Sequence, residues 1–266
     1  VIEQDGEDLV VGREAKTVSR EIRLDITSEV ETGVKTIITS AYRLGYDKLI
    51  VNFSNKEVMK VIKDVVANQL LGFEVIKEEA GRCEIENITE PSMEQFENIF
   101  NKVLLNIEEM FVDAEIMIKG GKCNYVDTAH KITEFDNFCR RVIAKNKKGE
   151  YYQLEWAFHS GLNRGQRELY HLLRHLEKSR VKNEKDLLKL LLQCREIFYL
   201  LRDAYNEKDI VLIEKIHERD KKVYDLGYTL LNKGKDGVAI HRLLSAARQF
   251  YLASSPLTGV VTALGD

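Results

Sequence analysis

Proline is almost missing from this sequence, which contains only Pro91 and Pro256 among its 266 residues. Because proline interrupts helices, such low usage favours long and continuous helices. Extended hydrophobic runs are missing as well. Runs such as residues 190–192 are far too short to cross a bilayer, so we expect no insertion into a membrane.

Paired cysteine motifs are also absent. The four cysteines, Cys83, Cys123, Cys139 and Cys194, form no CxxC pair and show no regular spacing. Without a recognisable signal peptide, this pattern predicts reduced thiols and a cytoplasmic protein. The net charge of -3 and the pI near 6.2, with both signs mixed along the chain, argue against a general binder of polyanions.

The sequence lacks the common signatures of enzymes. It contains no P-loop, no GxGxxG motif and no nucleophile elbow, and no Ser/His/Asp or Cys/His arrangement stands out. We therefore expect a protein that is not an enzyme, with no catalytic and no cofactor-binding residues.

The first third of the chain has the pattern of alternating strands and helices. The Asp5-Gly6 dipeptide, between apolar residues on both sides, predicts a hairpin over residues 1–11. Apolar alternation or short apolar runs then predict strands near residues 22–26, 49–51, 73–76 and 83–85, with helices over 30–44 and 58–70. The order β-α-β-α-β-β predicts a small sheet with helices packed on it.

The rest of the chain reads as helix. Ser92 and Gln95 form a capping-box pattern directly after Pro91, so we expect the first long helix to begin there and to end at Gly120-Gly121. Apolar positions spaced by three and four predict further helices over about 126–144, 151–179, 185–205, 211–231 and from 238 onward. We expect the third to be broken near Gly161 or Gly165. Short connections are typical of antiparallel neighbours.

An internal repeat links the second and fifth of these helices. Four residues of the segment 131–136 recur 84 positions later: Lys131, Ile132, Glu134 and Asp136 match Lys215, Ile216, Glu218 and Asp220. Both segments lie on the middle helix of a three-helix set, which favours a repeated unit.

Each repeat places an aspartate among apolar positions. Steps of three and four put Asp136 in line with Ile132 and Asp220 in line with Ile216, on the side of each helix that faces the core. A buried carboxylate needs a cation, a metal ion or hydrogen-bond donors. A single such residue would most simply be a structural ion pair or a helix-edge residue that reaches water. Two at matched positions favour a shared ancestral site.

On these residues the chain resembles the PhoU family over about residues 91–262. That family has two three-helix repeats whose middle helices carry an acidic motif resembling Glu-x-Asp-x-x-Val-Asp. The segment 218–224, Glu-Arg-Asp-Lys-Lys-Val-Tyr, fits it up to the last position, and the segment 134–140 fits more loosely. The resemblance implies a regulator that couples phosphate status to a phosphate transporter or its sensor through protein contacts, as a homodimer. It implies iron or zinc ligands at Glu134, Asp136, Glu218 and Asp220.

The segment 71–76, Leu-Gly-Phe-Glu-Val-Ile, is similar to archaeal members in which an AbrB-like hairpin and an α/β segment precede the helices. The fold class expected on this basis is α+β. Residues 1–12 would be the tail of an AbrB-like domain, residues 13–90 a small α/β domain, and residues 91–266 a helical domain with repeats at about 91–180 and 184–265. The DNA-contacting half would lie upstream, so DNA binding would depend on that segment.

Departures from the family pattern affect the iron or zinc site that the resemblance implies. The last carboxylate of the motif is replaced by Arg140 in the first repeat and by Tyr224 in the second. Iron and hard cations need several oxygen ligands in one place, so each loss weakens such a site. Arg140 follows Asp136 by one helical turn and can pair with it. We therefore hypothesise that an internal ion pair replaces a metal cluster in the first repeat.

A second class of protein fits part of the pattern. Glu168-x-x-His171 and Glu214-x-x-His217 are ExxH pairs on predicted helices, and di-iron carboxylate bundles use two such pairs with further glutamates. Those further ligands would come from Glu108, Glu134, Glu155 and Glu196. The alternative functions are therefore a di-metal oxidase or iron-storage bundle, and a regulator of a different ion transporter.

Overall fold

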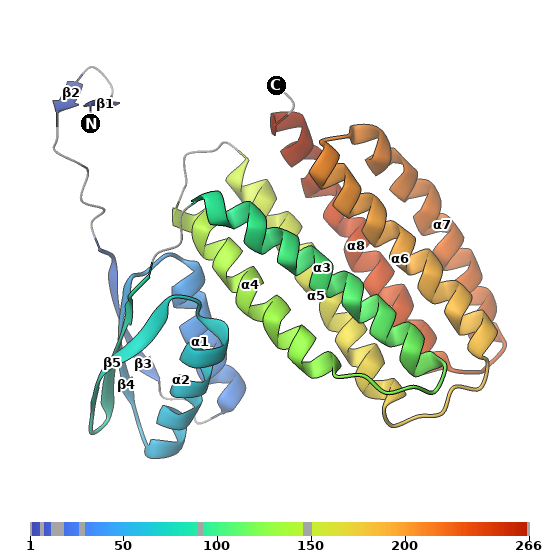
Figure 1. The fold of residues 1–266 in the computed structure, drawn as a ribbon, viewed down its shortest axis with the longest axis horizontal. Helices are drawn as coiled ribbons and strands as arrows, with labels where there is room; N and C mark the ends of the chain where they lie inside the picture. Colours follow the sequence, from blue (N-terminus) through green and yellow to red (C-terminus); the bar gives the residue numbers. More distant parts are fainter. Residues whose placement is uncertain are drawn as a thin grey trace.

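The computed structural model describes residues 2–5, 8–11, 19–26, 30–89, 93–145 and 151–264. Strands and two helices come first, and six long helices follow (Figure 1). The expected α+β class, with an all-helical C-terminal bundle, is confirmed.

The predicted N-terminal hairpin is present. Strand β1 (Ile2–Asp5) pairs antiparallel with β2 (Asp8–Val11), with Asp5 paired to Asp8. This hairpin forms a separate two-stranded sheet (Figure 1).

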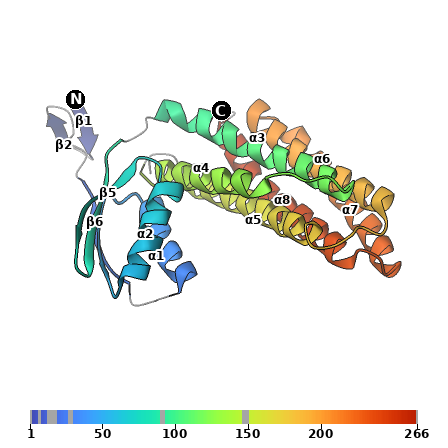
Figure 2. The same cartoon turned by 60° about the horizontal axis from the view of Figure 1, so that its bottom comes forward.

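The α/β domain follows the predicted order. Its elements are β3 (Glu21–Ile26), α1 (Glu31–Arg43), β4 (Lys48–Phe53), α2 (Lys56–Gln69), β5 (Phe73–Glu79) and β6 (Arg82–Asn87). The strand order across the sheet is β3-β4-β6-β5, with β3 and β4 parallel and the other pairs antiparallel. Helices α1 and α2 share an apolar core with this sheet. In both views they lie between the sheet and the helical bundle (Figures 1 and 2).

The long helices form two sets of three. The first set is α3 (Met93–Ile118), α4 (Tyr125–Lys145) and α5 (Tyr152–Leu176), and the second is α6 (Glu184–Glu207), α7 (Ile210–Asn232) and α8 (Gly237–Leu264). A single apolar cluster contains residues of all six. The predicted cap at Ser92 lies outside the described residues.

Helix α5 is continuous, so the break predicted near Gly161 or Gly165 was wrong. The two glycines instead allow α5 and α8 to approach closely. A β-carbon at Gly161 would lie 2.6 Å from the β-carbon of Ala253, and one at Gly165 would overlap the ring of Phe250. Glycine is tolerated inside this helix because the space a side chain would need is filled by α8.

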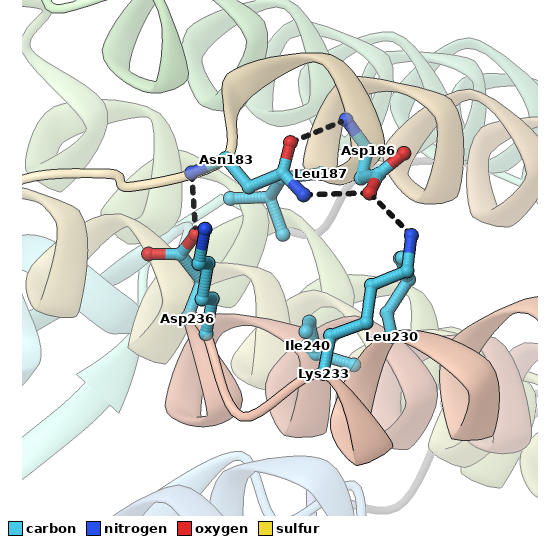
Figure 3. A pocket seen from close by; sticks show the side chains of 8 residues that line it. Asn183, Asp186, Leu187, Leu230, Lys233, Asp236 and Ile240 are labelled. Atoms are coloured by element: carbon cyan, nitrogen blue, oxygen red, sulfur yellow. Dashed lines mark hydrogen bonds and ion pairs between the residues drawn. The ribbon is translucent and has the colours of Figure 1, made fainter.

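Two aspartates join the segment before α6 to the segment between α7 and α8 (Figure 3). Asp236, just before α8, accepts hydrogen bonds from the backbone N–H of Asn183 (2.8 Å) and of Lys182 (2.9 Å). Asp186 in the first turn of α6 pairs with Lys233 at the end of α7, at 2.9 Å. These contacts surround a small pocket. They hold the start of α6, the end of α7 and the start of α8 together, so we assign them a structural role.

Among the described residues, no helix is both long enough and apolar enough to cross a membrane. All four cysteine thiols are free, and three of them are buried.

Replacing Gly161 with leucine should lower the free energy of unfolding by about 1–3 kcal/mol, because the added side chain overpacks the contact between α5 and α8. The control is Gly237→Leu, since a β-carbon at Gly237 has nothing within 4 Å. Urea unfolding of both variants measures the difference. Equal stabilities would contradict the close approach of the two helices.

Candidate functional site: a buried polar cluster on α4

The second half of α4 is buried on every side. Each residue from Asp136 to Ala144 is buried, although four of the first six are charged or carry an amide. Helices α3 and α5 of the bundle pack against α4, and so do α1 and α2 of the α/β domain. Every polar group here therefore needs a partner within the protein.

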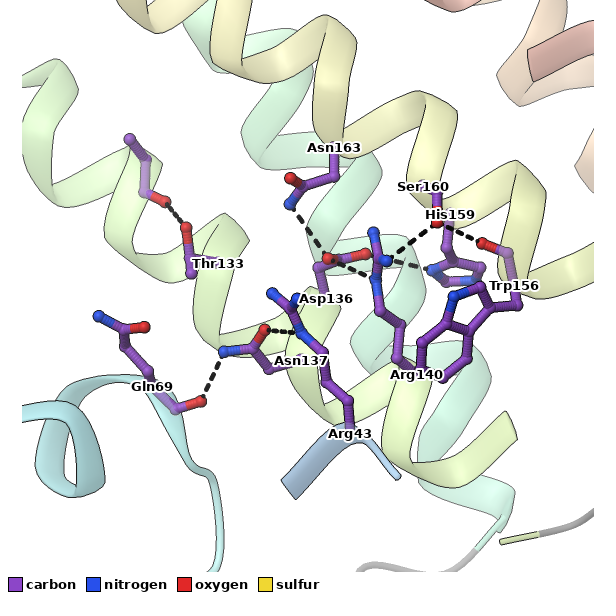
Figure 4. Close-up of polar contacts among 11 residues, drawn as sticks. Arg43, Gln69, Thr133, Asp136, Asn137, Arg140, Trp156, His159, Ser160 and Asn163 are labelled. Atoms are coloured by element: carbon purple, nitrogen blue, oxygen red, sulfur yellow. Dashed lines mark hydrogen bonds and ion pairs between the residues drawn. The ribbon is translucent and has the colours of Figure 1, made fainter. Parts of the chain in front are cut away.

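Asp136 lies at the centre of this cluster and is 1% exposed. Its Oδ2 accepts hydrogen bonds from Nε of Arg140 at 2.9 Å and from Nδ2 of Asn163 on α5 at 3.0 Å (Figure 4). Burial opposes ionisation, but the charges of Arg140 and of neighbouring groups outweigh it and hold the pKa of Asp136 below its usual value. The ion pair between Asp136 and Arg140 expected from their spacing is confirmed.

Arg140 has further contacts that fix its position. Its Nη1 donates to Oγ of Ser160 at 2.9 Å, and its guanidinium lies 5.5 Å from the ring centre of Trp156. Both partners are on α5. The ion pair on α4 thus also joins α4 to α5, and the planar guanidinium is held on one face by an aromatic ring.

His159 completes the cluster without a hydrogen bond of its own. The side chain is fully buried, and neither ring nitrogen has a hydrogen-bond partner. Its Nδ1 lies 3.6 Å from Oδ1 of Asp136, and its ring centre lies 4.3 Å from that of Phe100. Burial lowers the pKa of His159, with Asp136 acting in the opposite direction. The lowered pKa favours the neutral imidazole of His159 beside the carboxylate of Asp136.

A neighbouring face of α4 binds the α/β domain. Nδ2 of Asn137 donates to the carbonyl of Gln69 at 2.9 Å, and Oδ1 of Asn137 accepts from Nε of Arg43 at 2.7 Å (Figure 4). Asn137 is fully buried, and both ends of its amide are used. One side chain of the bundle therefore bonds both helices of the α/β domain.

Arg141 makes several contacts between the two parts. Its Nη1 donates to the carbonyls of Tyr46 (2.6 Å) and Tyr42 (3.2 Å), and its Nη2 contacts Oδ1 of Asp47 at 2.5 Å. The guanidinium also lies 4.7 Å from the ring centre of Phe73. Since only 3% of this side chain is exposed, the contact is formed in a poorly solvated place where charge-assisted hydrogen bonds are strong.

Asp47 is contacted from both parts of the chain. Lys145 reaches its Oδ1 at 2.8 Å, and the backbone N–H of Arg20 donates to its Oδ2 at 3.0 Å. Burial opposes ionisation of Asp47, but Lys145, Arg20 and Arg141 together lower its pKa. Asn137, Arg141 and Lys145 recur at every fourth position of α4. These three residues form a second polar stripe on α4, next to the stripe with Asp136 and Arg140. This second stripe is the sequence signal that could have revealed the contact between α4 and the α/β domain.

The matched position in the second repeat has a different environment. Asp220 is only half-buried, and its Oδ1 is a buried atom without a hydrogen-bond partner. Burial raises the pKa of Asp220, with Arg248 and His217 acting against the rise. The prediction that each aspartate faces the core holds fully for Asp136 and only in part for Asp220.

The predicted metal ligands are not brought together. Glu134 and Asp136 lie on α4, whereas Glu218 and Asp220 lie on α7, which packs on α6 and α8. Glu218 is exposed, and Glu134 is half-buried beside a groove next to α2 and β5. Among the residues that the structure describes, no three His, Cys, Asp or Glu side chains form a group that could hold a metal ion.

The carboxylates of the di-metal alternative are also dispersed, and three of them have arginine partners. Ion pairs at 2.8 Å join Glu108 to Arg202, Glu168 to Arg242 and Glu196 to Arg219. The second ExxH pair is exposed: Nδ1 of His217 lies 3.2 Å from the hydroxyl of Tyr251, and Glu214 faces solvent. His171 of the first pair is half-buried.

In comparisons with known proteins, no family model matches the chain, and no curated protein and no solved structure matches it.

Replacing Arg140 with methionine should lower the free energy of unfolding by about 3–5 kcal/mol, because Asp136 would stay buried without its principal cation. Adding Asp136→Leu should recover most of that loss, because an apolar pair no longer needs a partner. Urea unfolding of the two single variants and the double variant measures the coupling.

The matched control is Arg219→Met, which breaks a more exposed pair with Glu196 and should cost less than about 1 kcal/mol. Equal costs for Arg140→Met and Arg219→Met, or additive effects in the double variant, would rule out a buried pair of structural importance.

Glu155, at the start of α5, should make the stability depend on pH. Burial and the charge of Glu97 raise its pKa to about 7, with Lys208 acting in the opposite direction. The folded state binds this proton more tightly than the unfolded state, where the pKa is about 4.3. The penalty of ionisation is therefore absent below about pH 4.3 and complete above about pH 7.

Glu155→Gln should accordingly stabilise the protein at pH 8, by roughly 1–2 kcal/mol after allowance for solvent screening, and leave it unchanged near pH 4.5. Urea unfolding at several pH values measures the difference from the parent protein. The matched control is Glu214→Gln, which removes an exposed glutamate. A gain at pH 8 that persists at pH 4.5 would contradict the assignment.

Proposed function

We propose that this chain is a PhoU-like regulator of phosphate uptake, which acts by contact with a phosphate transporter or its sensor. The observation that carries the proposal is the pair of three-helix units in series, with aspartates at matched positions of the middle helices α4 and α7. A regulator of this kind needs a scaffold that presents surfaces, and no catalytic machinery.

The attachment of the α/β domain supports a signalling role. Arg141 and Asn137 connect the α/β domain to α4, the middle helix of the first repeat. A displacement of the α/β domain would therefore move α4, and the reverse. Coupling of this kind suits a protein that passes a binding event from one surface to a second.

Helix α3 offers a surface for such a contact. Leu105, Val112 and Ile116 are 62%, 44% and 39% exposed, and their spacing of seven and four places them along one side of the helix. We propose this stripe as the contact with the transporter or sensor; a second copy of the chain is the other occupant to be tested.

The di-metal oxidase or iron-storage function is less well supported, because the carboxylates it needs are dispersed among arginine pairs. Regulation of a different ion transporter fits the same scaffold. DNA binding would require a segment upstream of the hairpin.

The test is phosphate uptake in cells that lack this gene. Uptake in phosphate-rich medium should be derepressed and return to normal with the intact gene. Complementation with Leu105→Glu should fail if the stripe on α3 is the contact, whereas Glu214→Gln on the exposed face of α7 should restore control.

Three outcomes would count against the proposal. Unchanged phosphate uptake with altered transport of another ion would favour a different transporter. Stoichiometric iron or zinc in protein purified without a tag would favour the di-metal alternative and would also overturn the ion-pair hypothesis. Full complementation by Leu105→Glu together with a change from dimer to monomer would assign the stripe to a second copy.

A further inference from the structure

Arg43, the last residue of α1, has unused hydrogen-bonding capacity. Its Nε donates to Asn137, which fixes the guanidinium against α4 (Figure 4). Among the described residues, neither of its two terminal amino groups has a hydrogen-bond or ion-pair partner. Arg140 and Arg141, its buried neighbours on α4, both bind acceptors in the protein. A half-buried guanidinium with two free donor groups is well placed to bind an acceptor from outside.

The charges around Arg43 are not balanced. Burial and the charges of Arg140 and Arg167 lower the pKa of Arg43, and Asp136 is the one carboxylate that opposes them. Asp136 is already bonded to Arg140 and Asn163. Figure 4 shows the guanidinium groups of Arg43 and Arg140 beside Asp136, so two positive side chains face one carboxylate at this place.

Arg167 approaches this place from α5. It follows Asn163 by one helical turn, and the side chain of Asn163 reaches Asp136, so both residues lie on the side of α5 that faces α4. Arg167 is exposed, and among the described residues it has no ion-pair or hydrogen-bond partner. The other nearby carboxylate on α4, Glu134, instead lines the groove beside α2 and β5.

We propose that Arg43 and Arg167 bind a small tetrahedral oxyanion of the phosphate class between the α/β domain and the helical bundle. The planar fork of arginine matches the oxygen atoms of such an anion with two parallel hydrogen bonds. Asn137 holds Arg43 in place before the ligand arrives, which reduces the entropy lost on binding.

The bound anion would join α1 to α5, two helices that belong to different parts of the chain. Its binding would therefore strengthen the attachment of the α/β domain, beyond the contacts of Arg141. The site stands independently of the proposed function, since it follows from unpaired arginines and would exist in a regulator of any transporter.

Isothermal titration calorimetry of the full chain with inorganic phosphate, at low ionic strength and pH 7.5, tests the site. We expect one phosphate per chain, with affinity lowered at least tenfold by Arg43→Gln and by Arg167→Gln. Arg43→Lys, which keeps the charge and loses the fork, should fall between the parent and Arg43→Gln. Arg174→Gln removes an exposed arginine two turns further along α5 and should leave the affinity unchanged.

Two further arms identify the source of the anion. Sulfate that competes with phosphate would show recognition of the tetrahedral shape and charge. ATP that binds at least tenfold more tightly than inorganic phosphate, with the same dependence on Arg43 and Arg167, would assign the site to a phosphate group carried by a nucleotide. Both results support the oxyanion site.

The proposal is overturned if millimolar phosphate, sulfate and ATP all fail to bind, or if binding survives both Arg43→Gln and Arg167→Gln. Thermal unfolding of each variant separates a lost site from a lost fold. Should Arg43→Gln fail to fold, Arg167→Gln carries the test, because that side chain is exposed. Failure here with altered phosphate uptake in deletion cells would leave the proposed function standing without this ligand.

Discussion

Charged side chains cost several kcal/mol to bury unless they are paired, and the second half of α4 buries three of them within six positions. Asp136 and Arg140 meet this requirement within the bundle, and Arg141 meets it with the carbonyls and the carboxylate of the α/β domain. The position of that domain follows from this requirement. Without the α/β domain, the guanidinium of Arg141, whose side chain is 3% exposed, would face an apolar gap or open water.

The same requirement explains why Asp136 and Asp220 have different surroundings. Helix α4 is covered on both sides, whereas α7 packs on α6 and α8 and keeps its outer face in solvent. Asp220 can therefore hold one oxygen without a partner, since water reaches the rest of the side chain. The two aspartates occupy matched positions on α4 and α7, but Asp136 is enclosed by protein and Asp220 is partly in water. Because the local dielectric differs, charges act on the two carboxylates with different strength.

The sequence was sufficient for what depends on local periodicity. The order of strands and helices, the two three-helix sets and the pair formed by Asp136 and Arg140 all follow from spacings of two, three or four residues. It was insufficient where distant segments meet. Gly161 looks like a helix breaker until α8 is seen against it, and His159 looks unremarkable until its ring is found among Phe96, Phe100 and Phe158. The predicted metal ligands failed to converge because the two middle helices pack separately.

The role of Arg141 bears on how this protein can change over evolution. A domain joined only by a linker can be lost or exchanged as a unit, but here the carbonyls of Tyr42 and Tyr46 complete the shell of an arginine that belongs to the bundle. A lineage that discarded the α/β domain would have to replace Asn137 and Arg141 at nearly the same time. Loss of the α/β domain would leave these buried polar groups without their partners, although the sequence boundary near residue 90 suggests a simple junction.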